Sequence, residues 1–181
     1  VKPRAQKIDQ ESAFPTESIS KMSELGLMGI PWDQSYGGNG MDTTSLAIAI
    51  EEIGKVCSST AATMMAHTSL GSAPIALFGT EKQKKKYLPR LSAGEIIGAF
   101  GLTEPNAGSD AGNTQTRAVK KGNGYIINGQ KAFCTNAGYA GIIIITAVVK
   151  DGKPGEEKIA AFIVDKDTDG LKIGEPEKKM G

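Results

Sequence analysis

The sequence predicts an α+β protein, with a helical domain over residues 1–97 followed by a domain of β-strands over residues 98–181. Two observations support this division. Apolar residues recur at helical spacing between residues 14 and 93, whereas the later half contains short β-branched and aromatic runs separated by turn-forming segments. With 39% hydrophobic residues, the 181-residue chain can bury a substantial core in one large domain or two small ones.

Several short helices are expected in the first half because each apolar repeat is flanked by residues that favour helix ends. Four helices are expected: from Pro15 to Gly26, from Asp42 to Gly54, from Ser58 or Ser59 to His67, and from Thr80 to Leu91.

The second half favours strands. Residues 125–127, an Asn128-Gly129 turn and residues 131–135 are predicted to form a hairpin, because Asn-Gly is the strongest short hairpin signal. Further strands are expected at residues 142–149, 159–164 and 171–173, separated by segments rich in glycine, proline and charge at 151–157 and 165–170.

Between the two halves lies the loop 101–110, with the sequence GLTEPNAGSD. Its small residues would let backbone amides approach an anion, and phosphate is the natural guest for such a loop. Thr103 and Ser109 add hydroxyl donors. The alternative is a capped turn, in which the hydroxyls satisfy their own backbone and Pro105-Asn106 starts the bend.

Composition excludes several classes of function. The net charge is +1, so no nucleic-acid or anionic-membrane partner is expected, and no apolar run approaches the roughly 20 residues that span a bilayer. Two cysteines and one histidine predict neither a disulfide scaffold nor a metal site, and they favour a reducing compartment. The lysines between residues 82 and 86 are interpreted as a solvated helix face, and the absence of GxGxxG argues against a nicotinamide site.

Single reactive-looking residues have structural interpretations. Glu104 is predicted to be a turn or capping carboxylate that uses backbone donors of its own loop. His67 is expected to be packed or capping, since it has no partner set for metal or acid–base work. Cys134 is interpreted as a small buried residue that faces away from Phe133 and Thr135, and the pattern alone makes Phe133 a half-buried strand aromatic.

Motifs along nearly the whole chain resemble those of the acyl-CoA dehydrogenases. GLTEPNAGSD resembles the first flavin-contacting segment of that family. Further matches occur in the expected order: ELGLMGI, YGGNGMD, HTSLGSAPI, FGTEKQKKKYLPRLSAGE, YIINGQKAFCTNA and IAAFIVDKDTDGLKIGEPEKKMG. The overall similarity is greatest to short-chain, butyryl-CoA-type members.

The resemblance implies an organisation and an activity. It implies a helical N-terminal domain, a small β-barrel-like middle domain that is incomplete here, and a C-terminal four-helix domain that this chain lacks. The whole enzyme would oxidise a saturated acyl-CoA to a trans-2-enoyl-CoA by hydride transfer to N5 of FAD. The catalytic glutamate of the family lies in the C-terminal domain, so no residue of this chain is assigned as the base.

Partners and alternatives also follow from the resemblance. An electron-transferring flavoprotein would accept the electrons, the full-length enzyme would be a homotetramer, and its location would be the cytoplasm in a bacterium or the mitochondrial matrix in a eukaryote. Related enzymes act as enoyl-CoA reductases or acyl-CoA oxidases. A non-catalytic module that binds acyl-CoA or flavin is the alternative of another class.

The resemblance assigns site residues at matching positions. Residues 100–103 would lie along the isoalloxazine edge, Gly108 and Ser109 would face the pyrophosphate, Phe133 would pack on the flavin where many relatives have tryptophan, and Thr135 would contact N5. The flavin set is Phe100, Leu102, Thr103, Gly108, Ser109, Phe133 and Thr135. Ser109 is also expected near the CoA part, and the expected acyl-cavity wall includes Thr63, Met65 and Ala66, with the alternative that the methionines are plain core.

Overall fold

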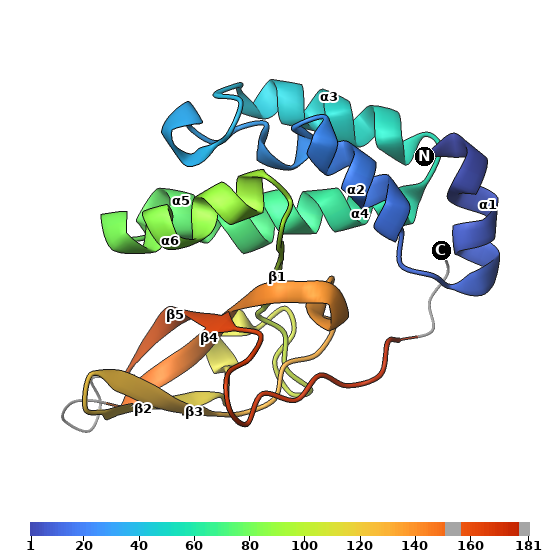
Figure 1. Ribbon diagram of the computed structural model, residues 1–181. Coiled ribbons are helices and arrows are strands. Elements are labelled where there is room, and N and C mark those ends of the chain that lie inside the picture. The colour runs from blue at the N-terminus through green and yellow to red at the C-terminus, as the bar shows by residue number, and fades with distance from the viewer. Residues whose placement is uncertain (151–156, 178–181) are drawn as a thin grey trace.

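The computed structural model describes residues 1–150 and 157–177, and it arranges them as a layer of helices above a mixed β-sheet (Figure 1). The segments 151–156 and 178–181 lie outside the described residues. They include most of the turn expected at 151–157 and the end of the last family motif. The chain passes from one layer to the other through β1, which runs down from the helices into the sheet (Figure 1).

The helical layer contains every helix predicted from the apolar repeats. Its elements are α1 (Lys2–Glu11), α2 (Thr16–Glu24), α3 (Thr43–Gly54), α4 (Ser58–Met65), the π-helical segment Ala66–Ser72, α5 (Ala73–Phe78) and α6 (Glu81–Ser92). Two of the predicted caps are confirmed. The Asp42 carboxylate accepts from the Ser45 N–H at 2.8 Å, and Thr80 forms a capping box with Gln83.

One predicted cap is wrong. Helix α4 begins at Ser58, but its N-cap is Cys57 and no side chain caps it. The Thr60 hydroxyl donates instead to the Cys57 sulfur at 3.0 Å, so the polar side chain near this end is satisfied without binding a helix N–H. Packing of Met64, which is fully buried, holds this helix against α2 and α3.

The sheet is organised around its longest strand. The strands are β1 (Ile97–Gly101), β2 (Arg117–Lys121), β3 (Gly124–Asn128), β4 (Ala140–Lys150) and β5 (Lys158–Asp165). Strand β5 pairs antiparallel with one edge of β4, while β1 and β2 pair parallel with successive parts of the other edge. The strands predicted at 142–149 and 159–164 are therefore confirmed.

The sheet is curled. Tyr125 of β3 and Phe162 of β5 make an edge-to-face ring contact at 5.1 Å, although neither strand is the other's neighbour in the sheet. Such a contact requires the two ends of the sheet to bend toward each other, which agrees with the barrel-like shape expected for this half.

The predicted hairpin is wrong in its register. Strand β3 pairs with β2, and the turn between them is Gly122-Asn123, with Gly122 at φ 58°. The segment 131–135 is not a strand. Gly129 does not form the hairpin turn. Glycine is needed there for space, because a Cβ would lie 2.3 Å from the Thr116 hydroxyl oxygen. The strand predicted at 171–173 is also wrong, since those residues are described and form no strand.

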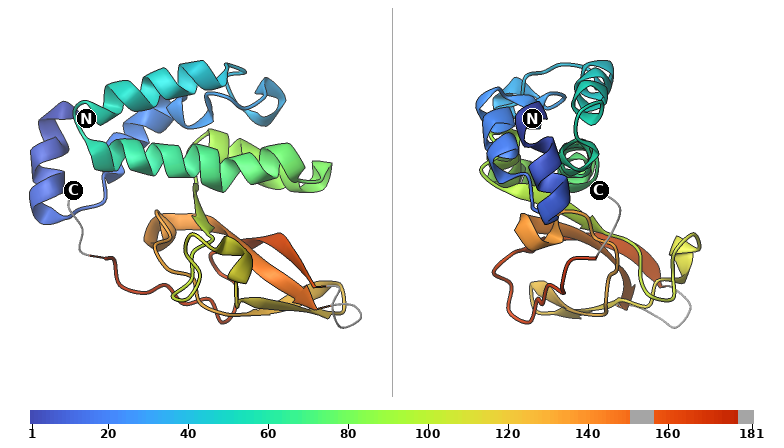
Figure 2. Two further views of the ribbon diagram at one scale, coloured as in Figure 1. Left: turned by 180° about the vertical axis from the view of Figure 1, so that it is seen from behind. Right: turned by 90° about the vertical axis from the view of Figure 1, so that its right-hand side faces the viewer.

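A shared core joins the helices to the sheet. Ile75, Leu88 and Leu91 pack against Ile142 and Ile144 of β4, and all five are almost fully buried. Figure 2 shows the helical layer over the same face of the sheet from two further sides. Because each layer supplies one side of this cluster, neither could leave the other without exposing apolar surface.

The layers approach most closely at two glycines. A Cβ on Gly71 of the π-helical segment would lie 2.5 Å from the Gly98 carbonyl carbon in β1. No side chain fits between these backbones, so both positions require glycine for space. The wider π-helical turn occurs at this contact, where the helix passes over the strand.

His67 lies beside that contact and is packed, as predicted. Its Nδ1 accepts from the Gly98 N–H at 3.0 Å, which fixes the proton on Nε2, and Nε2 then donates to the Leu91 carbonyl at 3.1 Å. Burial lowers the pKa of this imidazole from 6.5 to about 4. The hydrogen bond to Leu91 raises the pKa, but by less than burial lowers it. The neutral ring is therefore a structural clamp between β1, α6 and the π-helical segment.

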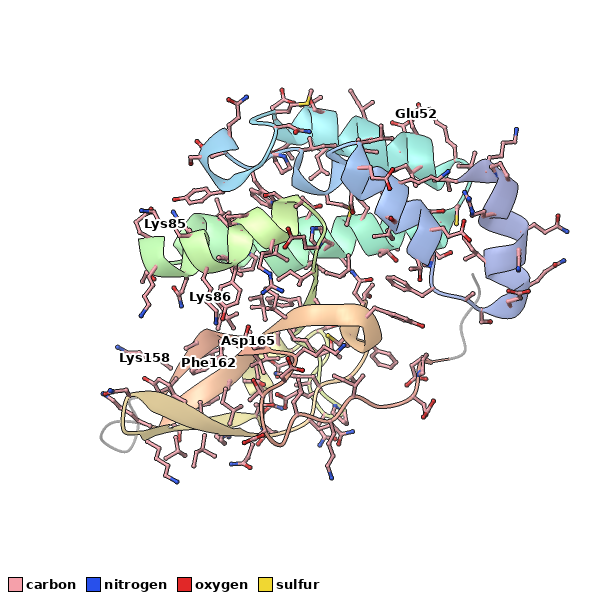
Figure 3. All side chains as sticks on the ribbon, in the orientation of Figure 1. Glu52, Lys85, Lys86, Lys158, Phe162 and Asp165 are labelled. Carbon is pink, nitrogen blue, oxygen red and sulfur yellow. The ribbon has the colours of Figure 1, made fainter. Side chains whose placement is uncertain are left out.

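A second tie joins α6 to β5 at the surface. Lys86 Nζ contacts the Asp165 carboxylate at 3.0 Å and the Tyr87 hydroxyl at 2.7 Å, and Figure 3 shows Lys86 and Asp165 pointing toward each other. Lys82 and Lys85 are exposed, in keeping with the predicted solvated face. Within the described ranges, no helix has the length and apolar character needed to cross a membrane.

Protonation of His67 is expected to destabilise the fold. The folded-state pKa of about 4 is below the unfolded value of 6.5, so the unfolded chain binds the proton first as pH falls. The free energy of unfolding should therefore fall between pH 6.5 and 4 by up to about 3 kcal/mol, beyond what the carboxylates contribute. Urea unfolding of wild type and His67→Gln at each pH measures this. Parallel curves for the two proteins across that range would contradict the clamp.

Candidate functional site

The loop after β1 forms a tight turn. The Glu104 N–H donates to the Ala107 carbonyl at 2.9 Å, and the Ala107 N–H returns a bond to the Glu104 carbonyl at 3.1 Å. Pro105 and Asn106 occupy the centre of this turn, as predicted. Gly108 and Ser109 follow it and are exposed, and a Cβ on Gly108 would meet no other atom within 4 Å. The turn thus presents an open backbone surface to solvent.

Glu104 is buried directly beneath this turn, with 5% of its surface exposed. Its carboxylate accepts from the Gln115 N–H at 2.6 Å and the Thr116 N–H at 3.1 Å. The hydroxyls of Thr114 and Thr116 also donate to it. The predicted structural role is confirmed, but the expected donors are wrong. They come from the chain ten to twelve residues later, because the carboxylate points inward and not along its own loop.

Lys131 supplies the opposite charge. Its Nζ lies 2.7 Å from the Glu104 carboxylate, 3.1 Å from the Leu102 carbonyl and 3.1 Å from the hydroxyls of Thr114 and Thr146. The two side chains are 4% and 11% exposed, so this ion pair is buried. A buried pair with satisfied hydrogen bonds fixes the position of its neighbours more than it adds stability.

The electrostatics keep the Glu104 carboxyl ionised. Burial raises the pKa of the Glu104 carboxyl, but hydrogen bonds from Lys131, Thr114 and Thr116 outweigh it and hold the pKa far below its usual range. Glu104 is therefore a carboxylate at any physiological pH. It cannot release or take up a proton in a reaction, which agrees with a structural and not a catalytic role.

This network brings two distant segments side by side. Lys131 binds the Leu102 carbonyl, and the next residue, Ala132, donates its N–H to the Thr103 carbonyl at 2.8 Å. Residues 101–103 and 132–135 therefore run together at the surface. Leu102 is 37% exposed and Phe133 is 63% exposed, so two large apolar side chains lie at the surface beside this network.

Phe133 differs from the half-buried strand aromatic that its pattern predicts. Its φ of 54° is left-handed, a conformation that bulky residues rarely adopt. Such backbone persists only where the surroundings enforce it, here the bonds of Lys131 and Ala132 on one side and Asn136 on the other. Thr135 is exposed beyond it. The two side chains are thus held at the surface on the same short segment.

Cys134 lies inward between them. It packs against the cluster of Ala99, Ala140 and Ile143. Burial raises the pKa of its thiol, with a smaller opposing effect from the Phe100 backbone, so the thiolate nucleophile is disfavoured. Cys134 thus packs inward and is not a nucleophile, as predicted, but it lies in a loop and is only partly buried.

The remaining predicted site residues are dispersed around this surface. Phe100 is half-buried in β1, where its side chain packs on the core between the layers. Thr63 and Ala66 are buried at 5% and 2% exposure, whereas Met65 on the same helical segment is 45% exposed. Met64, the preceding residue, is fully buried in the core. Met64 therefore fits the alternative that the methionines are core residues, whereas Met65 does not. An acyl-cavity role for Thr63, Met65 and Ala66 remains a prediction.

Sequence reasoning missed two residues that organise the site. Lys131 and Asn136 flank the segment 132–135, and their side chains bind the backbone of elements far away in sequence. One signal could have revealed Lys131. It and Glu104 carry opposite charges, and they lie on two segments that the resemblance places at the same cofactor. In the part of the chain that the structure describes, no group of three or more histidine, cysteine or acidic residues could hold a metal ion.

Comparison with known families accounts for both layers. Residues 1–95 match the N-terminal domain of acyl-CoA dehydrogenases, and residues 99–181 match their middle domain. The chain belongs to the acyl-CoA dehydrogenase family. It is 52% identical to a probable acyl-CoA dehydrogenase of Bacillus subtilis and 50% identical to a short-chain specific acyl-CoA dehydrogenase of Clostridium acetobutylicum, each over the whole chain and 48% of the relative. An NADH-dependent acryloyl-CoA reductase of Anaerotignum propionicum is 44% identical over the whole chain and 46% of its own length.

Solved structures agree with this assignment. An acyl-CoA dehydrogenase of Bacillus anthracis complexed with FAD matches with a TM-score of 0.89 and 40% identity, over 100% of this chain and 31% of that one. A structure described as the electron transferring flavoprotein of Acidaminococcus fermentans contains a chain that matches with a TM-score of 0.94 and 42% identity, over 100% of this chain and 47% of that one. The present chain spans about half the length of the curated relatives it matches.

Breaking the buried ion pair is expected to be costly. Lys131→Met would leave the Glu104 carboxylate buried without its counter-charge, so the free energy of unfolding should fall by about 3 kcal/mol. The Glu104→Gln/Lys131→Met double variant should lose less than the sum of the two single changes, since the charges are removed together. Urea unfolding of the two single variants and the double variant measures these free energies.

The matched control is Lys86→Met, which removes an exposed lysine from its pair with Asp165. Its loss should stay below about 1 kcal/mol. Equal losses for Lys86→Met and Lys131→Met would contradict the importance of the buried pair.

Proposed function

We propose that this chain supplies the flavin-facing part of an FAD-dependent enzyme that oxidises a short-chain acyl-CoA to the trans-2-enoyl-CoA. One observation carries the proposal. The exposed Leu102 and Phe133 are held next to the hydroxyl-bearing residues Thr103 and Thr135 by the bonds of Lys131 and Ala132. A flat ring with an apolar face and polar edges is the kind of ligand that such a surface suits.

The residues fit FAD in their chemistry. Phe133 offers an aromatic face for the isoalloxazine, and the hydroxyls of Thr103 and Thr135 offer donors for its polar edge. Gly108 and Ser109, after the turn at Pro105, offer an unobstructed backbone and a hydroxyl to a pyrophosphate. When bound, the flavin would supply the hydride acceptor for the oxidation.

The work of this chain in that reaction is to bind and orient. Donors near the edge of the flavin ring that gains charge would favour its reduction, and the packed segments would exclude water from one side of it. Glu104 cannot serve as the base because it is buried and its oxygens are already occupied by hydrogen bonds. The low pKa of its carboxyl also makes it too weak a base to take up a substrate proton. We therefore assign removal of the substrate proton to a carboxylate outside this chain, as the resemblance implies.

The short-chain preference is the finer part of the proposal. It is supported by the 50% identity to a relative named as short-chain specific. Among the three expected cavity residues, Met65 has the largest side chain and is 45% exposed, so it is the residue that would shorten an acyl pocket. An electron-transferring flavoprotein as acceptor and a homotetrameric assembly remain parts of the same proposal.

A second candidate is the reverse reaction. It is favoured by the 44% identity to a relative named as an acryloyl-CoA reductase that uses NADH. The surface formed by residues 102–103 and 133–135 would serve either direction, because the same contacts hold the flavin in both.

Anaerobic addition of butyryl-CoA to the full-length protein is expected to bleach its FAD absorbance near stoichiometry, because hydride transfer removes the oxidised flavin band. Octanoyl-CoA should reduce the flavin more slowly. Retained colour with butyryl-CoA, together with oxidation of the reduced enzyme by a short enoyl-CoA, would favour the reductase. A full-length protein with no flavin would contradict the proposal altogether.

Loss of the Phe133 ring should weaken flavin binding. Phe133→Ala is expected to raise the Kd for FAD by roughly 3- to 10-fold, since an aromatic stacking contact contributes about 0.5–1.5 kcal/mol. Phe133→Trp should keep the affinity. Fluorescence titration of the FAD-free full-length protein measures it. The control Phe78→Ala removes another exposed ring, 85% exposed at the end of α5, and should change nothing. A similar loss in both alanine variants would exclude a specific contact.

A further inference from the structure

Asn136 occupies the point where three parts of the molecule meet. It directly follows the segment 133–135, its φ is 71°, and its residue surface is 9% exposed. Its side-chain Nδ2 donates to the Thr63 carbonyl at 3.0 Å and to the Gly98 carbonyl at 3.3 Å. One buried amide therefore connects the loop, helix α4 and strand β1.

Each of its two acceptors belongs to an element of the site. Thr63 lies in α4, the helix that carries the predicted acyl-cavity residues up to the π-helical segment at Ala66. Gly98 lies in β1, which leads directly into Leu102 and Thr103. The Gly98 N–H is bound by His67, so both polar groups of this residue are held by buried side chains.

The chemistry at this point requires an asparagine. The amide N–H group donates to both carbonyl oxygens, and an aspartate of the same shape has no N–H to donate. The left-handed backbone disfavours branched or bulky residues, whereas asparagine and glycine adopt it readily. Glutamine would carry the amide one methylene further from the backbone, away from both carbonyls.

We propose that Asn136 is a positioning residue that sets the segment 133–135 in register with helix α4 and strand β1, and so sets the flavin surface relative to the acyl pocket. The inference rests on the proposed function. Asn136 contacts neither ligand in this arrangement. It acts through Thr63 on the acyl side and through the backbone next to Thr135 on the flavin side.

The test is Asn136→Gly in the full-length protein loaded with FAD. Glycine keeps the left-handed backbone and removes both hydrogen bonds. The control is Asn39→Gly, which removes an exposed amide bond from Asn39 to the Gly26 carbonyl within the helical layer. For each variant we would measure the Kd for FAD, the visible absorption spectrum of the bound flavin and the rate of its reduction at saturating butyryl-CoA.

In Asn136→Gly the Kd for FAD should rise by at least about fivefold, as expected when two buried hydrogen bonds that hold the segment are lost. The flavin spectrum should shift, and reduction at saturating substrate should slow by roughly tenfold, as misplacement of reacting groups predicts. Asn39→Gly should stay within about twofold of wild type in every measurement. If Asn136→Gly does not fold, Asn136→Ser, whose hydroxyl can donate one of the two bonds, should give intermediate values.

An Asn136→Gly protein with an unchanged flavin spectrum, Kd and reduction rate, even with a lowered unfolding temperature, would overturn the inference. A wild-type protein that binds FAD but is reduced by no acyl-CoA would contradict the proposed function instead. In that case the Kd and the spectrum of Asn136→Gly still decide the positioning role.

Discussion

The candidate site depends on the buried ion pair of Glu104 and Lys131. Without it, the loop after β1 and the segment after Gly129 would have few bonds between them beyond Ala132 to Thr103. The pair is ionised, buried and hydrogen-bonded on both sides, so it allows essentially one relative placement of the two segments. The cost of burying the charges is offset by four donors from residues 114–116, which also bind the intervening loop into the same unit.

The two layers are held to each other by a second set of constraints. Gly71 and Gly98 allow the helix and β1 to touch, His67 fixes that contact through two backbone bonds, and Asn136 extends it to the segment 133–135. The predicted acyl-cavity helix and the predicted flavin surface are thus parts of one rigid junction. Function in this family would require their relative position to be held within a fraction of an ångström, and the junction provides that constraint.

The sequence was most informative where structure is local. Asp42 and Thr80 cap their helices as predicted because a cap needs only residues three positions away, and the β-branched runs of β4 and β5 are visible without knowing their partners. The Asn128-Gly129 signal was misleading. Gly129 is needed for its contact with Thr116, a residue on another segment, and strand pairing at a distance does not appear in a local pattern. The site residues were predicted from the resemblance. The hydrogen bonds of Lys131 and Asn136 that hold them could be found only in the three-dimensional structure.

The most direct measurement is a crystal structure of the full-length protein with FAD bound. We expect the isoalloxazine to lie against Leu102, Thr103 and Phe133, with Lys131 still bridging the Leu102 carbonyl and the Glu104 carboxylate beneath it. A flavin ring bound elsewhere, or a Lys131 side chain turned away from Glu104 in the loaded protein, would contradict the claim that this buried pair shapes the flavin surface.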